Sequence, residues 1–195
     1  MKELEIIKGC KKGDRKAQRA LVDTYSNYIF TICMRYMKDQ GMAEDCLQES
    51  LVRILSNIDK YDDYGSFKSW MSTLTVRKCI DQLRKEKRHQ YSELDNVAEP
   101  GRKEVSNLKL EVEDVMNFVN TIPEQYRIVI NMFIVEGYSH KEIAETLGVT
   151  ESSSRSILTR ARRMIKNAFE EKKIKVLQQR EEDKTGLSNM KISWS

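Results

Sequence analysis

The side chains best suited to chemistry gather on one amphipathic stretch, residues 151–172. Its cations are joined near the N-terminal end by short hydroxyl side chains, and no acidic residue lies between Arg155 and Lys166. Guanidinium and hydroxyl groups that project from a helix can enter a major groove and hold phosphates. The cations on this stretch are Arg155, Arg160, Arg162, Arg163 and Lys166.

The segment before this stretch predicts a helix-turn-helix. Ser139 begins a short helix to Leu147, and Glu142 is placed to complete a capping box. Gly148 suits a left-handed turn, and Thr150 suits the cap of the second helix. Duplex DNA binding is favoured over an ordinary helical hairpin with a solvated basic face, because caps, turn and basic second helix agree. Taken alone, the motif would fit a repressor or a response-regulator output domain equally well.

An acidic face lies on another predicted helix, residues 42–58. Asp45, Gln48 and Glu49 are spaced three and four apart, so one face carries all three. Such a face could dock a basic partner, and a solvated helix start favoured by the helix dipole is an equally good interpretation of this segment alone. A catalytic carboxylate pair is disfavoured, because no nearby side chain completes a site.

Aromatic side chains are followed by basic ones between residues 59 and 88. Aromatic rings stack on unpaired bases while cations follow the phosphates, which is how single strands are held. The alternative is that the rings belong to the core, and for Trp70 we favour the core. The residues concerned are Tyr61, Tyr64, Phe67, Trp70, Arg77, Lys78, Arg84, Lys85, Lys87 and Arg88.

The chain has four cysteines, and none forms a CxxC pair or has a histidine at ligand spacing. We therefore predict no metal site and no cofactor. Each cysteine is interpreted as a small buried residue in a reducing compartment, although the sequence leaves oxidised pairing open. They are Cys10, Cys33, Cys46 and Cys79.

Composition favours helices arranged in two small domains. The 195 residues include only 2 Pro and 8 Gly, with 33% charged residues and a net charge of +4. We predict an all-α fold with domains at 1–90 and 108–173, a flexible linker at 91–107 and a polar tail at 174–195. Apolar spacing predicts helices over residues 16–37, 42–58, 67–88, 108–122, 123–135, 139–147 and 151–172. Without a signal peptide or a run of about 18 apolar residues, we expect a soluble cytoplasmic protein with no membrane insertion.

Three stretches together resemble the sigma-70 family, in its compact extracytoplasmic-function group. AEDCLQESLVRIL (43–55) is similar to the family's acidic DxxQE segment, and FKSWMSTLTVRKCIDQLRK (67–85) to its promoter-melting helix. Residues 122–165, IPEQYRIVINMFIVEGYSHKEIAETLGVTESSSRSILTRARRMI, resemble sigma region 4, a winged-helix-like helix-turn-helix domain. Arg77 stands where the family usually has Asn, and Ser154 where it has a β-branched apolar residue.

The resemblance implies a sigma factor that binds core RNA polymerase and directs promoter-specific initiation, with an anti-sigma factor as a further partner. Asp45, Gln48 and Glu49 would contact the beta-prime clamp helices, and the second domain would contact the beta flap. The residues that it implies bind the minus-ten element are Tyr61, Phe67, Trp70, Arg77, Lys78, Arg84 and Lys85. The residues that it implies bind the minus-thirty-five element are Ser153, Arg155, Ser156, Thr159, Arg160 and Arg163.

Two rival functions differ from this expectation. A stand-alone helix-turn-helix regulator would bind specific DNA tightly without polymerase. An enzyme is disfavoured, because the sequence offers no nucleophile–base set, metal cluster or Gly-rich phosphate loop.

Overall fold

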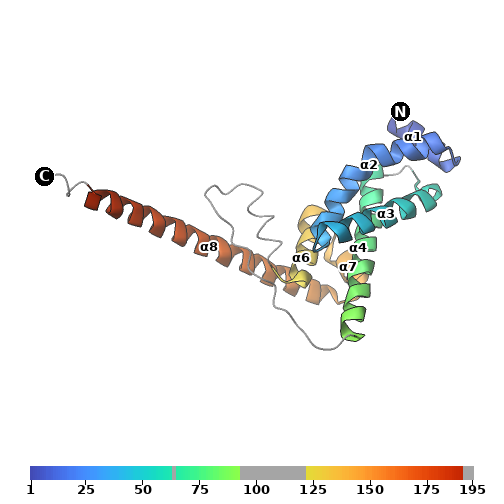
Figure 1. Cartoon of the computed structure of the whole chain (residues 1–195). Coiled ribbons are helices and arrows are strands. Elements are labelled where there is room, and N and C mark those ends of the chain that lie inside the picture. The colour runs from blue at the N-terminus through green and yellow to red at the C-terminus, as the bar shows by residue number, and fades with distance from the viewer. Residues whose placement is uncertain (63–64, 93–121, 191–195) are drawn as a thin grey trace. The chain divides into compact units, whose positions relative to one another are not determined.

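A computed structural model describes residues 1–62, 65–92 and 122–190, and every regular element within these ranges is helical (Figure 1). The all-α prediction is therefore confirmed. The elements are α1 (Glu3–Lys11), α2 (Arg15–Tyr36), α3 (Gln40–Ser56), η1 (Ile58–Lys60), α4 (Phe67–Ser92), α6 (Glu124–Ile130), η2 (Asn131–Val135), α7 (His140–Leu147) and α8 (Glu151–Met190).

The described chain divides into two compact units. The first contains α1 to α4 together with the short segments 134–137 and 145–148, and the second contains α6, most of α7 and α8. The sequence assigned both short segments to the second domain. Most of the predicted linker 91–107 and the predicted helix 108–122 lie outside the described residues.

In the first unit, α2 is the central helix and packs against α1, α3 and α4. Its buried stripe repeats every three or four residues, as the sequence predicted, and includes Leu21, Ile29 and Ile32. Asp14 caps α2 by accepting a hydrogen bond from the Lys16 amide at 2.8 Å. Asp39 caps α3 in the same way, by accepting a hydrogen bond from the Met42 amide.

Helix α1 is an addition to the predicted elements. It has only three buried residues, and it packs on α2 through a close approach at Gly9. A Cβ built on Gly9 would lie 2.4 Å from the Cβ of Ala17, so a larger residue would force the helices apart. The Tyr25 hydroxyl of α2 also donates to the Glu3 carboxylate of α1 at 2.6 Å.

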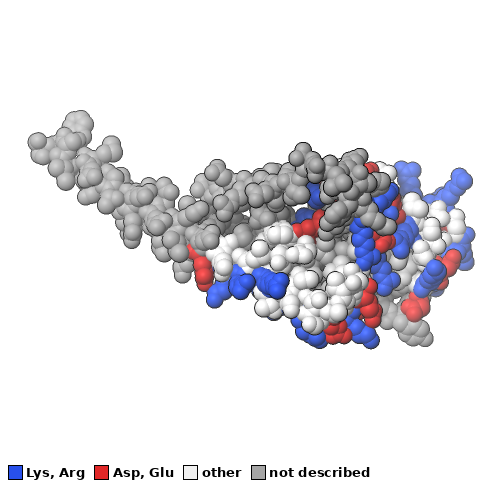
Figure 2. Space-filling model, turned by 90° about the horizontal axis from the view of Figure 1, so that it is seen from below, with Lys and Arg blue, Asp and Glu red and all other residues white. Residues whose placement is uncertain are grey.

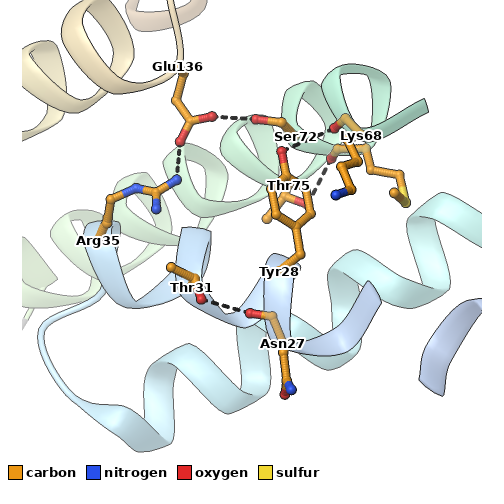
Figure 3. Close-up of polar contacts among 9 residues, drawn as sticks. Asn27, Tyr28, Thr31, Arg35, Lys68, Ser72, Thr75 and Glu136 are labelled. Carbon is orange, nitrogen blue, oxygen red and sulfur yellow. Dashed lines mark hydrogen bonds and ion pairs between the residues drawn. The ribbon is translucent and has the colours of Figure 1, made fainter. Parts of the chain in front are cut away.

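Polar contacts tie α2 and α4 together within the first unit (Figure 3). Glu136, from the 134–137 segment, accepts hydrogen bonds from the Arg35 guanidinium and from the Ser72 hydroxyl. The Tyr28 hydroxyl donates to the Lys68 carbonyl at 3.4 Å. The buried carboxylate of Glu136 is thus neutralised by a cation rather than left alone in the unit's interior.

In the second unit, α6 packs against α8. The chain leaves α6 through η2, a single π-helical turn, and Gly137 follows it with φ +75°. Pro123 forms the N-cap of α6. Helix α8 continues to Met190, well beyond the predicted end at 172, so most of the predicted polar tail is helical; residues 191–195 lie outside the described residues.

Candidate nucleic-acid interface

The first helix of the predicted helix-turn-helix begins with the capping box that the sequence indicated. The Ser139 amide and hydroxyl both donate to the Glu142 carboxylate, at 2.8 and 2.7 Å, and the Glu142 amide donates to the Ser139 hydroxyl at 3.2 Å. These hydrogen bonds lower the pKa of Glu142, because they favour its charged form. The cap fixes where α7 starts.

The turn between α7 and α8 also follows the prediction. Gly148 has φ +70°, a left-handed conformation that a side chain disfavours. The Val149 amide donates to the Ala144 carbonyl at 3.1 Å, which closes the end of α7. Thr150 then caps α8 by accepting from the Ser153 amide at 3.1 Å.

The exposed face of α8 carries the side chains predicted to meet duplex DNA. Five of the six are exposed, and Ser153 is half-buried with its hydroxyl bonded to Thr150 at 2.9 Å. Arg155 is paired with Glu151 at 2.8 Å, one turn earlier on the same helix. Solvent-exposed pairs of this kind are weak, so a phosphate or a base edge could displace Glu151. The exposed five are Arg155, Ser156, Thr159, Arg160 and Arg163.

Two residues that sequence reasoning did not assign hold α8 against α7. Ser154 is fully buried, and its hydroxyl shares a hydrogen bond with His140 Nδ1 at 2.9 Å. The His140 ring stacks on Phe133 at 4.6 Å between centroids, and the Arg162 guanidinium lies over the Phe133 ring, 5.8 Å from its centroid. The departure at Ser154 is therefore compensated by a polar partner. The only sign of this contact in the sequence was a histidine 14 residues before the serine.

The acidic face lies on α3 with Asp45, Gln48 and Glu49 all exposed. Glu49 forms an ion pair with Lys78 of α4. The structure thereby joins a residue of the predicted docking face to one predicted to contact DNA. Lys78 is half-buried in this pair and is not presented to solvent as an isolated cation.

Three further cations of α4 that were predicted to contact DNA are exposed. Arg77 and Lys85 lie on its surface, and Arg84 donates to the Thr146 carbonyl of the 145–148 segment at 2.8 Å. On the face drawn in Figure 2, blue and red side chains are interspersed over the described surface at the right, so cations and acids are not sorted into two broad areas there.

The aromatic residues of the predicted single-strand site form a cluster inside the first unit. Tyr61 and Phe67 are 6% and 1% exposed, so their rings have almost no surface on which a base could stack. Their centroids lie 5.0 Å apart, and Trp70 lies 5.5 Å from Tyr61 and 5.6 Å from Phe67. Trp70 is half-buried, which leaves part of its ring accessible, and Tyr64 lies outside the described residues. The core interpretation thus fits Tyr61 and Phe67 better than the base-stacking one.

None of the helices that the structure describes combines the length and the apolar character needed to cross a bilayer.

Comparisons with known proteins match both halves of this arrangement. The pattern of Sigma-70 region 2 matches residues 21–89, and that of Sigma-70 region 4 matches residues 113–165, together more than half of the chain. The ECF RNA polymerase sigma factor SigW of Bacillus subtilis is 29% identical over 173 residues, which are 82% of this chain and 92% of that protein. The ECF RNA polymerase sigma-E factor of Escherichia coli is 26% identical over 175 residues, covering 83% and 91%.

The fold is also found in a solved sigma factor structure. It is the sigma factor RpoE of Bartonella quintana, crystallised with the anti-sigma factor NepR, with a TM-score of 0.54 and 18% identity. The match covers 78% of this chain and 96% of that one.

Proposed function

The chain belongs to the sigma-70 family, in its extracytoplasmic-function group, and on that premise we propose that it binds core RNA polymerase and directs promoter-specific transcription initiation. The observation that carries the proposal is the pairing, on one chain, of a region 2 match with a region 4 match whose second helix exposes a row of cations. Each part alone would fit other DNA-binding proteins.

The proposed division of labour follows the two units. The exposed face of α8 reads an upstream element in duplex DNA through Arg155 and its neighbours, because guanidinium groups there can reach base edges and phosphates. The acidic face of α3 docks on the beta-prime clamp helices, where opposite charge gives specificity. The second unit also contacts the beta flap.

The downstream element is assigned to α4 and the residues before it. Arg77, Arg84 and Lys85 are exposed cations that can meet phosphates or bases, and Trp70 is the ring with accessible surface. Tyr61 and Phe67 support Trp70 from within the core. The opening of base pairs is driven by binding energy, and this chain makes or breaks no covalent bond. We propose that it acts in the cytoplasm and that an anti-sigma factor controls it.

Run-off transcription with purified core polymerase tests the proposal. A library of promoter fragments is transcribed with and without the protein. We expect transcripts from a discrete subset of fragments only when the protein is present. A uniform background with folded protein and active core enzyme would contradict the proposal.

Docking is tested separately with the double variant Asp45→Lys/Glu49→Lys. Polymerase binding in a pull-down should be lost, because both changes place cations where a basic surface must dock. Asp23→Lys is the matched control, since Asp23 is an exposed acid on α2 outside the acidic face. Circular dichroism checks folding, because the substitution at Glu49 also removes the ion pair with Lys78. Undiminished binding by the folded double variant would remove the docking role.

The stand-alone regulator predicts a different result. Isolated protein would bind one duplex sequence tightly, and binding would be indifferent to core polymerase. Specific binding that appears only with polymerase favours the sigma factor.

A further inference from the structure

Three of the four cysteines meet at one point in the first unit. Cys33 comes from α2, Cys46 from α3 and Cys79 from α4, so each of the three mutually packed helices contributes one thiol. Their sulfur atoms all lie within 4.8 Å of one another, and the Cys46 and Cys79 sulfurs share a hydrogen bond at 3.4 Å. Their exposed fractions are 0%, 2% and 0%. The sequence indicated buried cysteines, but nothing in their spacing showed that these three converge.

The spacing of the three sulfurs fits a single central atom. With a sulfur bond of about 2.3 Å and bond angles between pyramidal and planar, three ligands of one atom are separated by roughly 3.4 to 4.0 Å. The Cys46–Cys79 separation of 3.4 Å falls in this range and no pair is more than 4.8 Å apart, so small side-chain rotations would complete the set. No histidine, aspartate or glutamate in the part of the chain that the structure describes joins the cluster as a fourth ligand.

The pKa values of the three thiols shift in different directions. The pKa of the Cys46 thiol is lowered, mainly because the Cys33 and Cys79 thiols donate hydrogen bonds to its thiolate. The Ser50 hydroxyl and the Lys78 ammonium act in the same direction. Hydrogen bonding within the cluster raises the pKa of Cys33 and Cys79. The convergence and the burial of the three sulfur atoms, and not these shifts, define the candidate site.

Charge decides which central atom suits this position. Three thiolates around a monovalent or divalent ion leave a net negative charge, which is costly in a dry core. The nearby Lys78 ammonium is already paired with Glu49, so it does not balance this charge. Zinc sites of the structural kind also use four ligands. A trivalent thiophilic atom such as arsenic(III) takes three sulfurs and forms a neutral product. Arsenous acid and three thiols give one tris-thiolate and three water molecules, so no oxidant is needed and no charge is buried.

We propose that Cys33, Cys46 and Cys79 form a three-coordinate binding site for a trivalent thiophilic ligand of the arsenite class. Its occupation would bond α2, α3 and α4 to one atom. Because the thiols are buried, the ligand enters through transient opening of the helix packing. The site is independent of the proposed function, since it requires neither polymerase nor DNA.

Native mass spectrometry of the full chain after equilibration with sodium arsenite tests the site. We expect one adduct per chain whose mass is that of one arsenic less three hydrogens, which reports three sulfur bonds directly. Cys10→Ala is the matched control: Cys10 is also buried, but it lies on α1 outside the cluster. This variant should form the same adduct. The Cys46→Ala and Cys79→Ala variants should lose it and retain at most a two-thiol adduct that keeps one hydroxyl on arsenic.

Thermal unfolding supplies a second readout. A ligand that binds the folded chain raises the melting temperature, whereas one that binds thiols of the unfolded chain lowers it. We expect arsenite to raise the melting temperature of the wild-type protein and of Cys10→Ala, and to leave Cys46→Ala unchanged. Even if a cluster variant folds poorly, the wild-type adduct mass and its melting shift decide the question.

Three results obtained with arsenite would overturn the proposal. They are a wild-type adduct with only two sulfur bonds, a loss of the adduct in Cys10→Ala, and a fall in the wild-type melting temperature. Stronger stabilisation by zinc than by arsenite would also overturn it, because a fourth ligand would then complete a different site.

Discussion

Arg155 is an exposed cation of α8, and in the absence of DNA its guanidinium is paired with Glu151. We expect Arg155→Ala to weaken binding of the holoenzyme to its preferred upstream sequence by about 1–3 kcal/mol, and to weaken binding to mismatched sequences less. Fold stability should hardly change, since exposed ion pairs contribute roughly 0–1 kcal/mol. Quantitative footprinting on a promoter series at one salt concentration measures the difference.

Lys166 is the matched control for this prediction, because it is also exposed on α8 and paired one turn away, with Glu170. Lys166→Ala should have the same effect on binding to every promoter sequence. An equal loss on every sequence for Arg155→Ala would identify Arg155 as a phosphate contact without sequence preference.

Ser154 shows how one buried polar group can hold two helices in register. We expect Ser154→Ala to lower the free energy of unfolding by about 1 kcal/mol, because the hydrogen bond to His140 is lost inside the protein. Urea denaturation followed by circular dichroism measures the change. Ser152→Ala, at an exposed position on the same helix, should have little effect. Equal stability of the two variants would show that the Ser154 contact adds nothing.

Two glycine substitutions, one in the turn before α8 and one in α3, should have opposite effects. Gly148→Ala should destabilise the protein by roughly 1–2 kcal/mol, because alanine is strained at φ +70°. Gly41→Ala should stabilise it by about 0.5 kcal/mol, because Gly41 lies in the first turn of α3 and a Cβ there meets only Asp39 at 3.4 Å. Thermal unfolding of both variants compares the signs. A neutral Gly148→Ala would mean that the turn can relax to another conformation.

The capping box of α7 predicts a dependence of stability on pH. Because the folded-state pKa of Glu142 is lowered by Ser139, its contribution is present above the unfolded pKa and is lost as the pH falls through the folded pKa. The stability difference between wild type and Glu142→Gln should therefore shrink on acidification. Glu145→Gln, exposed on the same helix, is the control. A difference that stays constant through the acidic range would contradict a charged cap.

Helices with strong local signals were predictable from the sequence, and those that depend on tertiary contacts were not. α2, α3, α4 and α7 have apolar residues every three or four positions, and their observed bounds follow the predicted ones closely. Polar caps also begin α2, α3 and α7. α1 was missed because it has few apolar residues, and these are buried only through packing against α2. The end of α8 was misplaced because the segment after 172 is polar with only scattered apolar residues, so no apolar spacing extended the prediction there.

For the site, the sequence predicted which residue types share a helix face, but it did not predict their burial or their tertiary contacts. The exposed arginines of α8 and the acidic face of α3 are where their helical spacing put them. The burial of Tyr61 and Phe67 depends on which rings they meet, and an aromatic residue suits a core and a base-stacking surface equally well. The meeting of three cysteines and the Ser154–His140 bond arise from helix packing, which the sequence alone does not specify.

For the whole molecule, the proposed function requires both units to contact one DNA duplex at the same time. Inserting about 5 base pairs between the upstream and downstream elements rotates one by roughly half a turn relative to the other. We expect such promoters to lose transcription that depends on this protein, whereas the same insertion upstream of both elements should be tolerated. Run-off transcription compares the three templates. Full activity of the spaced promoter would show that one element suffices.

The ion pair between Glu49 and Lys78 connects the two surfaces assigned to different macromolecules. A partner that takes up the Glu49 carboxylate releases the Lys78 ammonium, and a phosphate that takes up the ammonium releases the carboxylate. Whichever of the two binds first, polymerase or promoter DNA, must supply the free energy that breaks the ion pair, and the second does not. By thermodynamic reciprocity, whatever one binding event contributes to the affinity of the second, the second returns to the first. We therefore expect this one contact between α3 and α4 to couple the binding of polymerase to the binding of the promoter.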